Sequence, residues 1–119
     1  MTERQKLEKR LDDIVSEIVR KRDKCCITCG GNKDSAGHFM KRRHNGTRWN
    51  LTNVNAQCWD CNRNDDWEAY KSAMIMQYGE EVTENIITLA HSNVNYSNSD
   101  LKDLYSELLE CKHNLFNCD

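Results

Sequence analysis

Apolar residues recur every three or four positions between residues 3 and 22, which predicts an amphipathic helix with one apolar face. This face consists of six aliphatic residues: Leu7, Leu11, Ile14, Val15, Ile18 and Val19. Thr2 and Gln5 fit a capping box at the start of the helix, where it would satisfy backbone donors of the first turn. We expect the apolar face to pack on the same domain or on a second copy of the chain.

The second half of the chain shows the same helical spacing. It predicts helices over about residues 64–78 and 80–90, and a last helix that Ser97 or Ser99 caps. Gly79 is placed to end the first of these helices. The residues expected to face inward are Trp67, Tyr70, Ala73, Met74, Gln77, Val82, Ile86, Leu89, Ala90, Leu101, Leu104, Tyr105, Leu108, Leu109 and Leu115.

The segment between these helices, residues 24–63, has a different pattern, with four glycines and few apolar residues. His38–Arg42 and Thr47–Leu51 are predicted as short strands, with Asn45-Gly46 as the turn between them. The apolar content of this segment is too low for it to fold unaided. We therefore expect an additional element, such as a bound metal, to hold it together.

Length and composition set the scale of the molecule. At 119 residues and 14.0 kDa the chain has the size of one domain, which we divide into an N-terminal helix (1–23), a core (24–78) and C-terminal helices (79–119). No stretch approaches the roughly 18 apolar residues of a membrane span, and the N-terminus begins a charged helix rather than a signal segment. We therefore expect a soluble protein of the cell interior, without a membrane partner.

The charge is distributed unevenly along the chain, although the net charge is only −2. Residues 20–48 contain nine basic and two acidic residues, a formal charge of +7. Residues 64–119 contain eleven acidic and three basic residues, a formal charge of −8. The basic segment could bind a polyanion, but charge alone does not distinguish such a surface from an ordinary solvated face.

Two Cys-x-x-Cys pairs enclose the core-poor segment: Cys26 with Cys29, and Cys58 with Cys61. Two such pairs can surround a zinc ion tetrahedrally with four thiolates, and a site of this kind is structural because it leaves no open coordination position. Buried free thiols and a redox pair are the alternatives. The neighbouring Cys25 could compete with Cys26, although its spacing to Cys29 is less suitable.

Cys111 and Cys118 lie outside both pairs, in or near the last predicted helix. Both are expected to be packing or incidental thiols rather than metal ligands. The total of seven cysteines is odd, which argues against a closed set of disulfides.

One histidine and two asparagines lie within or directly beside the predicted zinc loop. His38 lies inside the loop, Asn53 lies five residues before Cys58, and Asn62 directly follows Cys61. This arrangement resembles that of HNH (ββα-metal) nucleases. Over about residues 20–115 the fuller pattern resembles the phage NinG/Rap family of recombination proteins. The matching positions are Cys26-x-x-Cys29-Gly30, Ala36-Gly37-His38-Phe39, Arg48-Trp49-Asn50, Asn53, Gln57-Cys58-x-x-Cys61-Asn62, Tyr70 and Tyr78-Gly79-Glu80-Glu81.

The resemblance implies both a fold and an activity. The fold would be α+β, with a small zinc-stapled ββα-metal core, HNH-like and of treble-clef type, and flanking α-helices. The activity would be that of a structure-specific DNA endonuclease on branched recombination intermediates, of the Holliday junction or D-loop type, leaving 3′-OH and 5′-phosphate ends. The resemblance also implies a phage or prophage protein in the cytoplasm of a bacterial host.

Phosphodiester hydrolysis requires an activated water and a cation near the phosphate. His38 is the candidate general base, because imidazole titrates near neutral pH. Asn53 is the candidate residue that orients the loop or the ring of His38. The amide oxygen of Asn62 could bind a catalytic Mg²⁺ or Mn²⁺, since these cations prefer oxygen ligands. Hydrogen bonding of His38 within a strand, and turn formation or capping by the asparagines, are the non-catalytic alternatives.

Four basic residues of the same loop are the candidate DNA-binding residues. Arg48 matches the family pattern and could hold a phosphate, and Lys41, Arg42 and Arg43 lie close by in sequence. A four-way junction carries paired cleavage sites, and two active sites in a two-fold homodimer could cut both. The apolar faces of residues 7–19 and 101–115 are the candidate dimer surfaces.

The chain departs from many HNH proteins at one position. Those proteins carry a metal-binding Asp directly before the catalytic His, whereas this chain has Gly37, as the NinG-like pattern does. Asp34, Asp60, Asp65 and Asp66 are candidates for the missing oxygen ligand. Two alternative functions remain at this point: a zinc-stabilised DNA-binding module without catalysis, and a helical interaction protein whose zinc only holds the fold.

Overall fold

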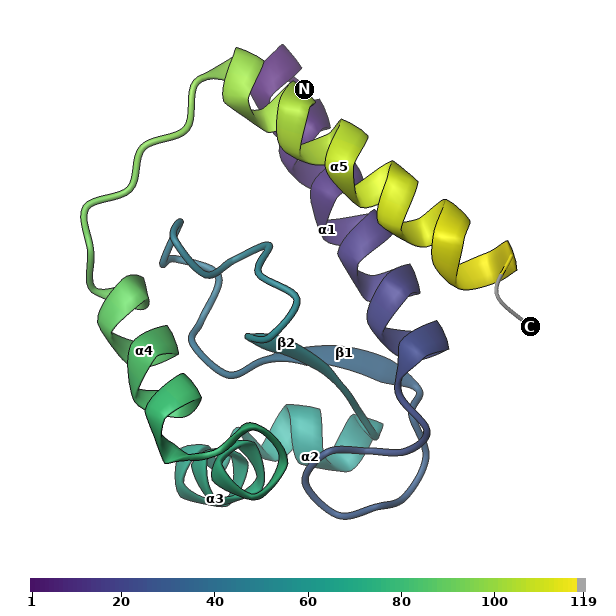
Figure 1. The fold of residues 1–119 in the computed structure, drawn as a ribbon, viewed down its shortest axis with the longest axis vertical. Helices are drawn as coiled ribbons and strands as arrows, with labels where there is room; N and C mark the ends of the chain where they lie inside the picture. Colours follow the sequence, from purple (N-terminus) through teal and green to yellow (C-terminus); the bar gives the residue numbers. More distant parts are fainter. Residues whose placement is uncertain (118–119) are drawn as a thin grey trace.

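The computed structural model describes residues 1–117, so Cys118 lies outside the described part of the chain (Figure 1). The described residues form five helices and one two-stranded sheet, which confirms the α+β class. In chain order these elements are α1 (Glu3–Arg22), β1 (Ser35–His38), β2 (Val54–Gln57), α2 (Trp59–Asn64), α3 (Trp67–Tyr78), α4 (Glu80–Ala90) and α5 (Asn98–Asn117). None of the helices in this range combines the length and apolar character that crossing a membrane requires.

Helices α1 and α5 lie side by side and run in the same direction, as Figure 1 shows. The capping box of Thr2 and Gln5 is present, and the six predicted apolar residues of α1 are buried. Two ion pairs link the helices. Glu3 pairs with Lys102 near the starts of both helices, and Glu17 pairs with Lys112 closer to their ends. The two apolar faces that the sequence suggested as dimer surfaces therefore pack largely on each other within one chain.

The predicted strands His38–Arg42 and Thr47–Leu51 are wrong, because the residues between positions 40 and 53 form turns. The sheet instead pairs β1 with β2 in antiparallel register, from Ser35 opposite Gln57 to His38 opposite Val54. All four residues of β2 are buried, because α1 packs on one face of the strand while polar side chains from α3 reach the other. A strand with both faces covered shows none of the contrast between solvent and core on which strand prediction depends.

The helix expected over about residues 64–78 is α3, which begins at Trp67 and is preceded by the separate short helix α2. Helix α2 ends where Asp65 adopts a left-handed conformation, with φ 53° and ψ 42°. Asp66 then caps α3 by accepting a hydrogen bond from the backbone of Ala69. As predicted, Gly79 ends α3, and its φ of 92° suits glycine.

Some side chains point differently from the prediction. Val82 is 40% exposed, and Thr83 is buried in its place, with its hydroxyl donating to the carbonyl of Gly79. Leu109 is 43% exposed on the outer side of α5. Ser97, rather than Ser99, caps α5: Ser97 Oγ accepts from the backbone of Asp100, whose carboxylate accepts in return.

The sheet separates two hydrophobic clusters. One lies between α1, α5 and β2 and includes Trp49 and Val54. The other lies against α3 and α4 and includes Phe39, Met40 and Tyr70. Since Phe39 and Met40 directly follow β1, the end of β1 is anchored in the cluster against α3 and α4.

Candidate functional site

The four cysteines of the two Cys-x-x-Cys pairs come together as one group. The sulfur atoms of Cys26, Cys29, Cys58 and Cys61 all lie within 4.8 Å of one another, and those of Cys29 and Cys58 are 3.7 Å apart. A tetrahedral zinc site with Zn–S distances near 2.3 Å requires sulfur separations of about 3.8 Å. The four cysteines could therefore hold a structural zinc, whereas Cys25 is exposed and lies outside the group.

Backbone geometry prepares this group for metal. Gly30 has a φ of 77° and donates its N–H to the carbonyl of Cys26, which makes the tight turn around the first pair. Burial alone would raise the pKa of the Cys26 thiol, but hydrogen bonds with the backbone of Cys29, Cys58 and Thr28 lower it to about 7. Cys26 therefore readily supplies a thiolate for zinc, whereas burial and the neighbouring cysteine thiols raise the pKa of Cys61.

His38 is the last residue of β1 and is half-buried. Its Nε2 lies 2.9 Å from the carbonyl oxygen of Arg48. Burial lowers the pKa of His38 below its usual value, and nearby Arg42 acts in the same direction. The imidazole is therefore neutral at neutral pH, with the proton on Nε2 and the lone pair on Nδ1, which is the state that a general base requires.

Asn53 is fully buried and makes all its side-chain hydrogen bonds to backbone groups. Its Oδ1 accepts from the N–H of Met40 at 2.8 Å, and its Nδ2 donates to the carbonyls of Met40 and Thr47, both at 3.0 Å. These bonds fix the end of β1 to the turns that follow it. Of the two orienting roles considered for Asn53, the geometry supports fixing the loop rather than contacting the His38 ring.

Asn62 lies in α2, and its Nδ2 donates to Ser35 Oγ at 3.1 Å. A small pocket of about 10 Å³ has both Asn62 and His38 among its lining residues, together with Gln57, Asp65 and Asp66. This volume is about that of one water molecule. The structure therefore brings His38 and Asn62 to one pocket, while Asn53 supports the loop behind it.

The Arg48 side chain faces helix α1. Its guanidinium donates to both carboxylate oxygens of Asp12, at 3.1 and 2.7 Å, and lies 3.5 Å from Glu8. The hydrogen bond with Asp12 raises the pKa of Arg48. The same carboxylate accepts from Trp49 Nε1 at 2.8 Å. In this state Arg48 anchors the loop to α1, and phosphate binding by Arg48 stays a prediction.

The other three basic candidates differ in their surroundings. Arg42 and Arg43 are exposed, as phosphate contacts require. Lys41 is half-buried, and its ammonium contacts the carboxylate of Asp65 at the small pocket. The basic loop therefore presents two exposed guanidinium groups, which directly follow Lys41 in sequence, and the Lys41 ammonium lies at the pocket.

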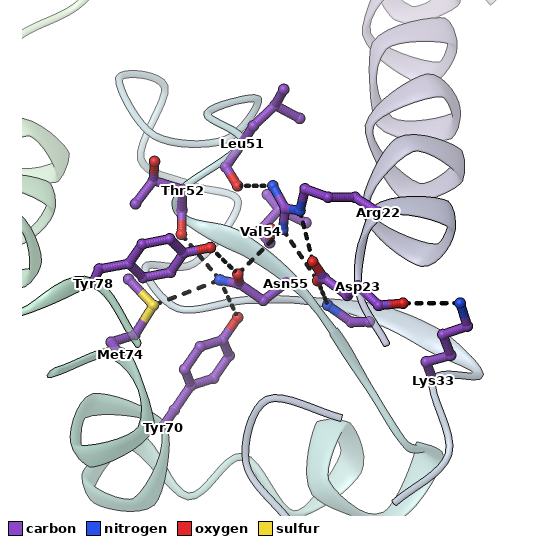
Figure 2. Close-up of polar contacts among 11 residues, drawn as sticks. Arg22, Asp23, Lys33, Leu51, Thr52, Val54, Asn55, Tyr70, Met74 and Tyr78 are labelled. Carbon is purple, nitrogen blue, oxygen red and sulfur yellow. Dashed lines mark hydrogen bonds and ion pairs between the residues drawn. The ribbon is translucent and has the colours of Figure 1, made fainter. Parts of the chain in front are cut away.

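A buried polar network around Asn55, which the sequence analysis did not identify, supports the strand that ends in His38 (Figure 2). Asn55 Oδ1 accepts from the hydroxyl of Tyr78 at 2.6 Å and from Arg22 at 3.3 Å. Asn55 Nδ2 donates to the Tyr70 hydroxyl, which in turn donates to the carbonyl of Gly37 at 2.7 Å. The backbone directly before His38 is therefore tied to β2 and α3.

The end of α1 joins the same network, as Figure 2 also shows. Arg22 donates to the carbonyl of Leu51 at 2.7 Å, and the Asp23 carboxylate accepts from the backbone of Ala56 at 2.8 Å. Burial would lower the pKa of Arg22, but the bond and charge of Asp23 raise it. The ion pair of Arg22 and Asp23 thus bonds to backbone groups of β2 and of the turn before it, and these bonds fix the end of α1 against β2.

The Gln57 side chain occupies the space beside Gly37 into which a side chain would project. A Cβ atom at this position would lie 1.8 Å from Gln57 Oε1. The Gln57 amide is held there, because its Nε2 donates to Thr28 Oγ1 at 2.9 Å. The Asp that many HNH proteins carry at this position therefore cannot be accommodated without moving Gln57.

Comparisons with known proteins agree with the resemblance seen in the sequence. Neither the curated proteins nor the solved structures gave a match. A family described as the bacteriophage lambda NinG protein matches residues 1–116, which is nearly the whole chain. The chain therefore belongs to the phage NinG family.

Proposed function

We propose that this protein is a divalent-metal-dependent endonuclease that cleaves branched DNA recombination intermediates. The observation that carries the proposal is the shared pocket of His38 and Asn62, beside a four-cysteine group that could hold zinc. The order of strand, strand and helix around this pocket is the order that HNH nucleases use. Membership of the phage NinG family supports a role in recombination.

The chain's own groups account for the steps of hydrolysis. His38 Nδ1 would take a proton from water, whose oxygen then attacks phosphorus while the bond to the 3′ oxygen breaks. The departing 3′ oxygen takes a proton from solvent water, which leaves 3′-OH and 5′-phosphate ends. A divalent cation held by the Asn62 oxygen would stabilise the charge that develops on the phosphate oxygens. Asn53 keeps the loop in place, and the cysteine group fixes the helix that carries Asn62.

The substrate would be held by the exposed guanidinium groups of Arg42 and Arg43. Phosphate contacts carry no sequence information, so a preference for branches would come from DNA shape. Arg48 could reach a phosphate only by leaving Asp12.

Synthetic four-way junctions and linear duplexes, incubated with Mg²⁺ or with EDTA, test this function. We expect junction cleavage with Mg²⁺ and none with EDTA. His38→Ala should reduce the rate by about 10²–10⁴-fold while DNA affinity and zinc content stay the same. His113→Ala, on the exposed side of α5, is the control and should cleave like the wild type.

Three other outcomes would contradict parts of this proposal. If His38→Ala cleaves junctions at the wild-type rate, His38 is not the base. If no preparation cleaves DNA but salt-dependent binding is present, the protein is a zinc-stabilised DNA-binding module. Neither cleavage nor salt-dependent binding would favour the helical interaction protein.

A further inference from the structure

Among the oxygen-bearing side chains that line the pocket beside His38, three come from separate positions: Gln57 on β2, Asn62 in α2, and Asp65 after α2. We propose that their oxygens form the divalent-cation site, in which Gln57 and Asp65 supply the ligands that Gly37 lacks. This inference rests on the proposed function, because it completes the cation site that hydrolysis needs.

Gln57 is placed as the substitute for a side chain at position 37. Its Oε1 occupies the space into which a Cβ of residue 37 would project, and the residue is only 4% exposed. Its amide nitrogen is engaged by Thr28, in the turn of the first cysteine pair, so the oxygen end faces Gly37. A buried amide oxygen held in this way needs no reorganisation to bind a cation.

The structure selects one acid from the four that the sequence offered. Asp34 and Asp60 are exposed and do not line the pocket. Asp66 lines the pocket but uses one carboxylate oxygen to cap α3. Asp65 also lines the pocket, and its carboxylate contacts a cation there, the ammonium of Lys41.

The chemistry of this ligand set suits Mg²⁺ or Mn²⁺. Both ions accept carboxylate and amide oxygens and keep several waters, so three protein oxygens are sufficient. The ammonium of Lys41 and a divalent ion would compete for the Asp65 carboxylate. Binding of the ion would release Lys41, which then becomes available to a DNA phosphate beside the site.

Electron paramagnetic resonance of Mn²⁺, titrated into the zinc-loaded full chain without DNA, tests the site. We expect saturable binding of one Mn²⁺ by the wild type and at least about tenfold weaker binding by Asp65→Asn. Asparagine tolerates the left-handed conformation of residue 65, so the fold should be preserved. Asp60→Asn, which removes the same charge outside the pocket, should bind like the wild type.

A second variant tests whether Gln57 is a ligand, because it should increase the affinity for Mn²⁺. Gln57→Glu adds a carboxylate at the pocket, and the Thr28 hydroxyl can donate to it, so Mn²⁺ should bind more tightly than to the wild type. Absence of Mn²⁺ binding by the wild type, or unchanged binding by Asp65→Asn, would overturn the site. Unchanged binding by Gln57→Glu would overturn the assignment of Gln57.

Junction cleavage by the same preparations separates this inference from the proposed function. If the wild type cleaves and Asp65→Asn both binds Mn²⁺ and cleaves normally, the function stands and the ligand assignment fails. If Asp65→Asn loses Mn²⁺ but the wild type cleaves no DNA, the cation site stands and the nuclease function fails.

Discussion

His38 Nε2 and the carbonyl oxygen of Arg48 lie 2.9 Å apart, so His38 donates to the same residue whose side chain is bound to Asp12 on α1. A carbonyl oxygen can only accept, and the bond therefore fixes the tautomer of the neutral ring. The position of Arg48 depends in turn on its ion pair. The orientation of the candidate base is thus coupled to helix α1, outside the segment between the cysteine pairs.

The lowered pKa of His38 predicts the pH dependence of cleavage. A general base works when deprotonated, and burial keeps His38 deprotonated to lower pH than an ordinary histidine, whose pKa is about 6.5. We expect kcat/KM for junction cleavage to fall on the acid side with an apparent pKa below that value. A profile measured between pH 5 and 8 checks this, and an acid limb above pH 6.5 would contradict it.

Asn53 should be required for stability as well as for activity. Asn53→Ala leaves the N–H and the carbonyl of the buried Met40 without this partner, and each such loss costs about 1–3 kcal/mol. Urea unfolding should show a loss of several kcal/mol. Asn45→Ala, in the less buried turn of the same loop, is the control; an Asn53 variant as stable as that control would contradict the supporting role.

The helices and the cysteine group could be predicted from the sequence because they depend on local spacing. The period of α1 and the Cys-x-x-Cys distances are each contained within a few residues. The sheet could not be located in the same way, because β2 carries buried asparagine and glutamine beside valine and alanine. Most hydrogen-bond partners of the Asn55 side chain come from α1 and α3, which lie far away in the sequence.

The remaining part of the site depends on tertiary contacts. Gln57 reaches Gly37 only in the observed register of β1 and β2, and Asp65 enters the pocket because the chain leaves α2 in a left-handed conformation. Arg48 was predicted as a phosphate ligand from its place in a motif. Its ion pair with Asp12 joins residues 36 positions apart, which no local pattern indicates.

The arginines of the loop should differ in their effects: Arg42 and Arg43 should affect DNA binding, and Arg48 should affect stability. Charge reversal at Arg42 and Arg43 should weaken binding to all DNA sequences and reduce the dependence of affinity on salt, because these side chains are exposed. Arg48→Met should instead lower stability by about 1–3 kcal/mol, since the half-buried Asp12 loses its ion pair and keeps only the hydrogen bond from Trp49. Binding measured at several salt concentrations, with urea unfolding, checks both. An Arg48 variant that is fully stable but has a reduced salt dependence would assign Arg48 to the DNA.

Loss of zinc should unfold the region that the cysteine group closes. This region has few apolar residues of its own, and the binding energy of a structural zinc is folding energy, about 10–16 kcal/mol in small zinc domains. We expect one zinc per chain in purified protein and loss of circular dichroism and junction binding on strong chelation. Cys61→Ser should behave like the chelated protein, because it removes one of four ligands whose sulfurs lie within 4.8 Å. Cys111→Ser, on α5 and outside the group, should keep its zinc; folded wild-type protein without zinc would show that the sheet and the two hydrophobic clusters suffice to hold the pocket.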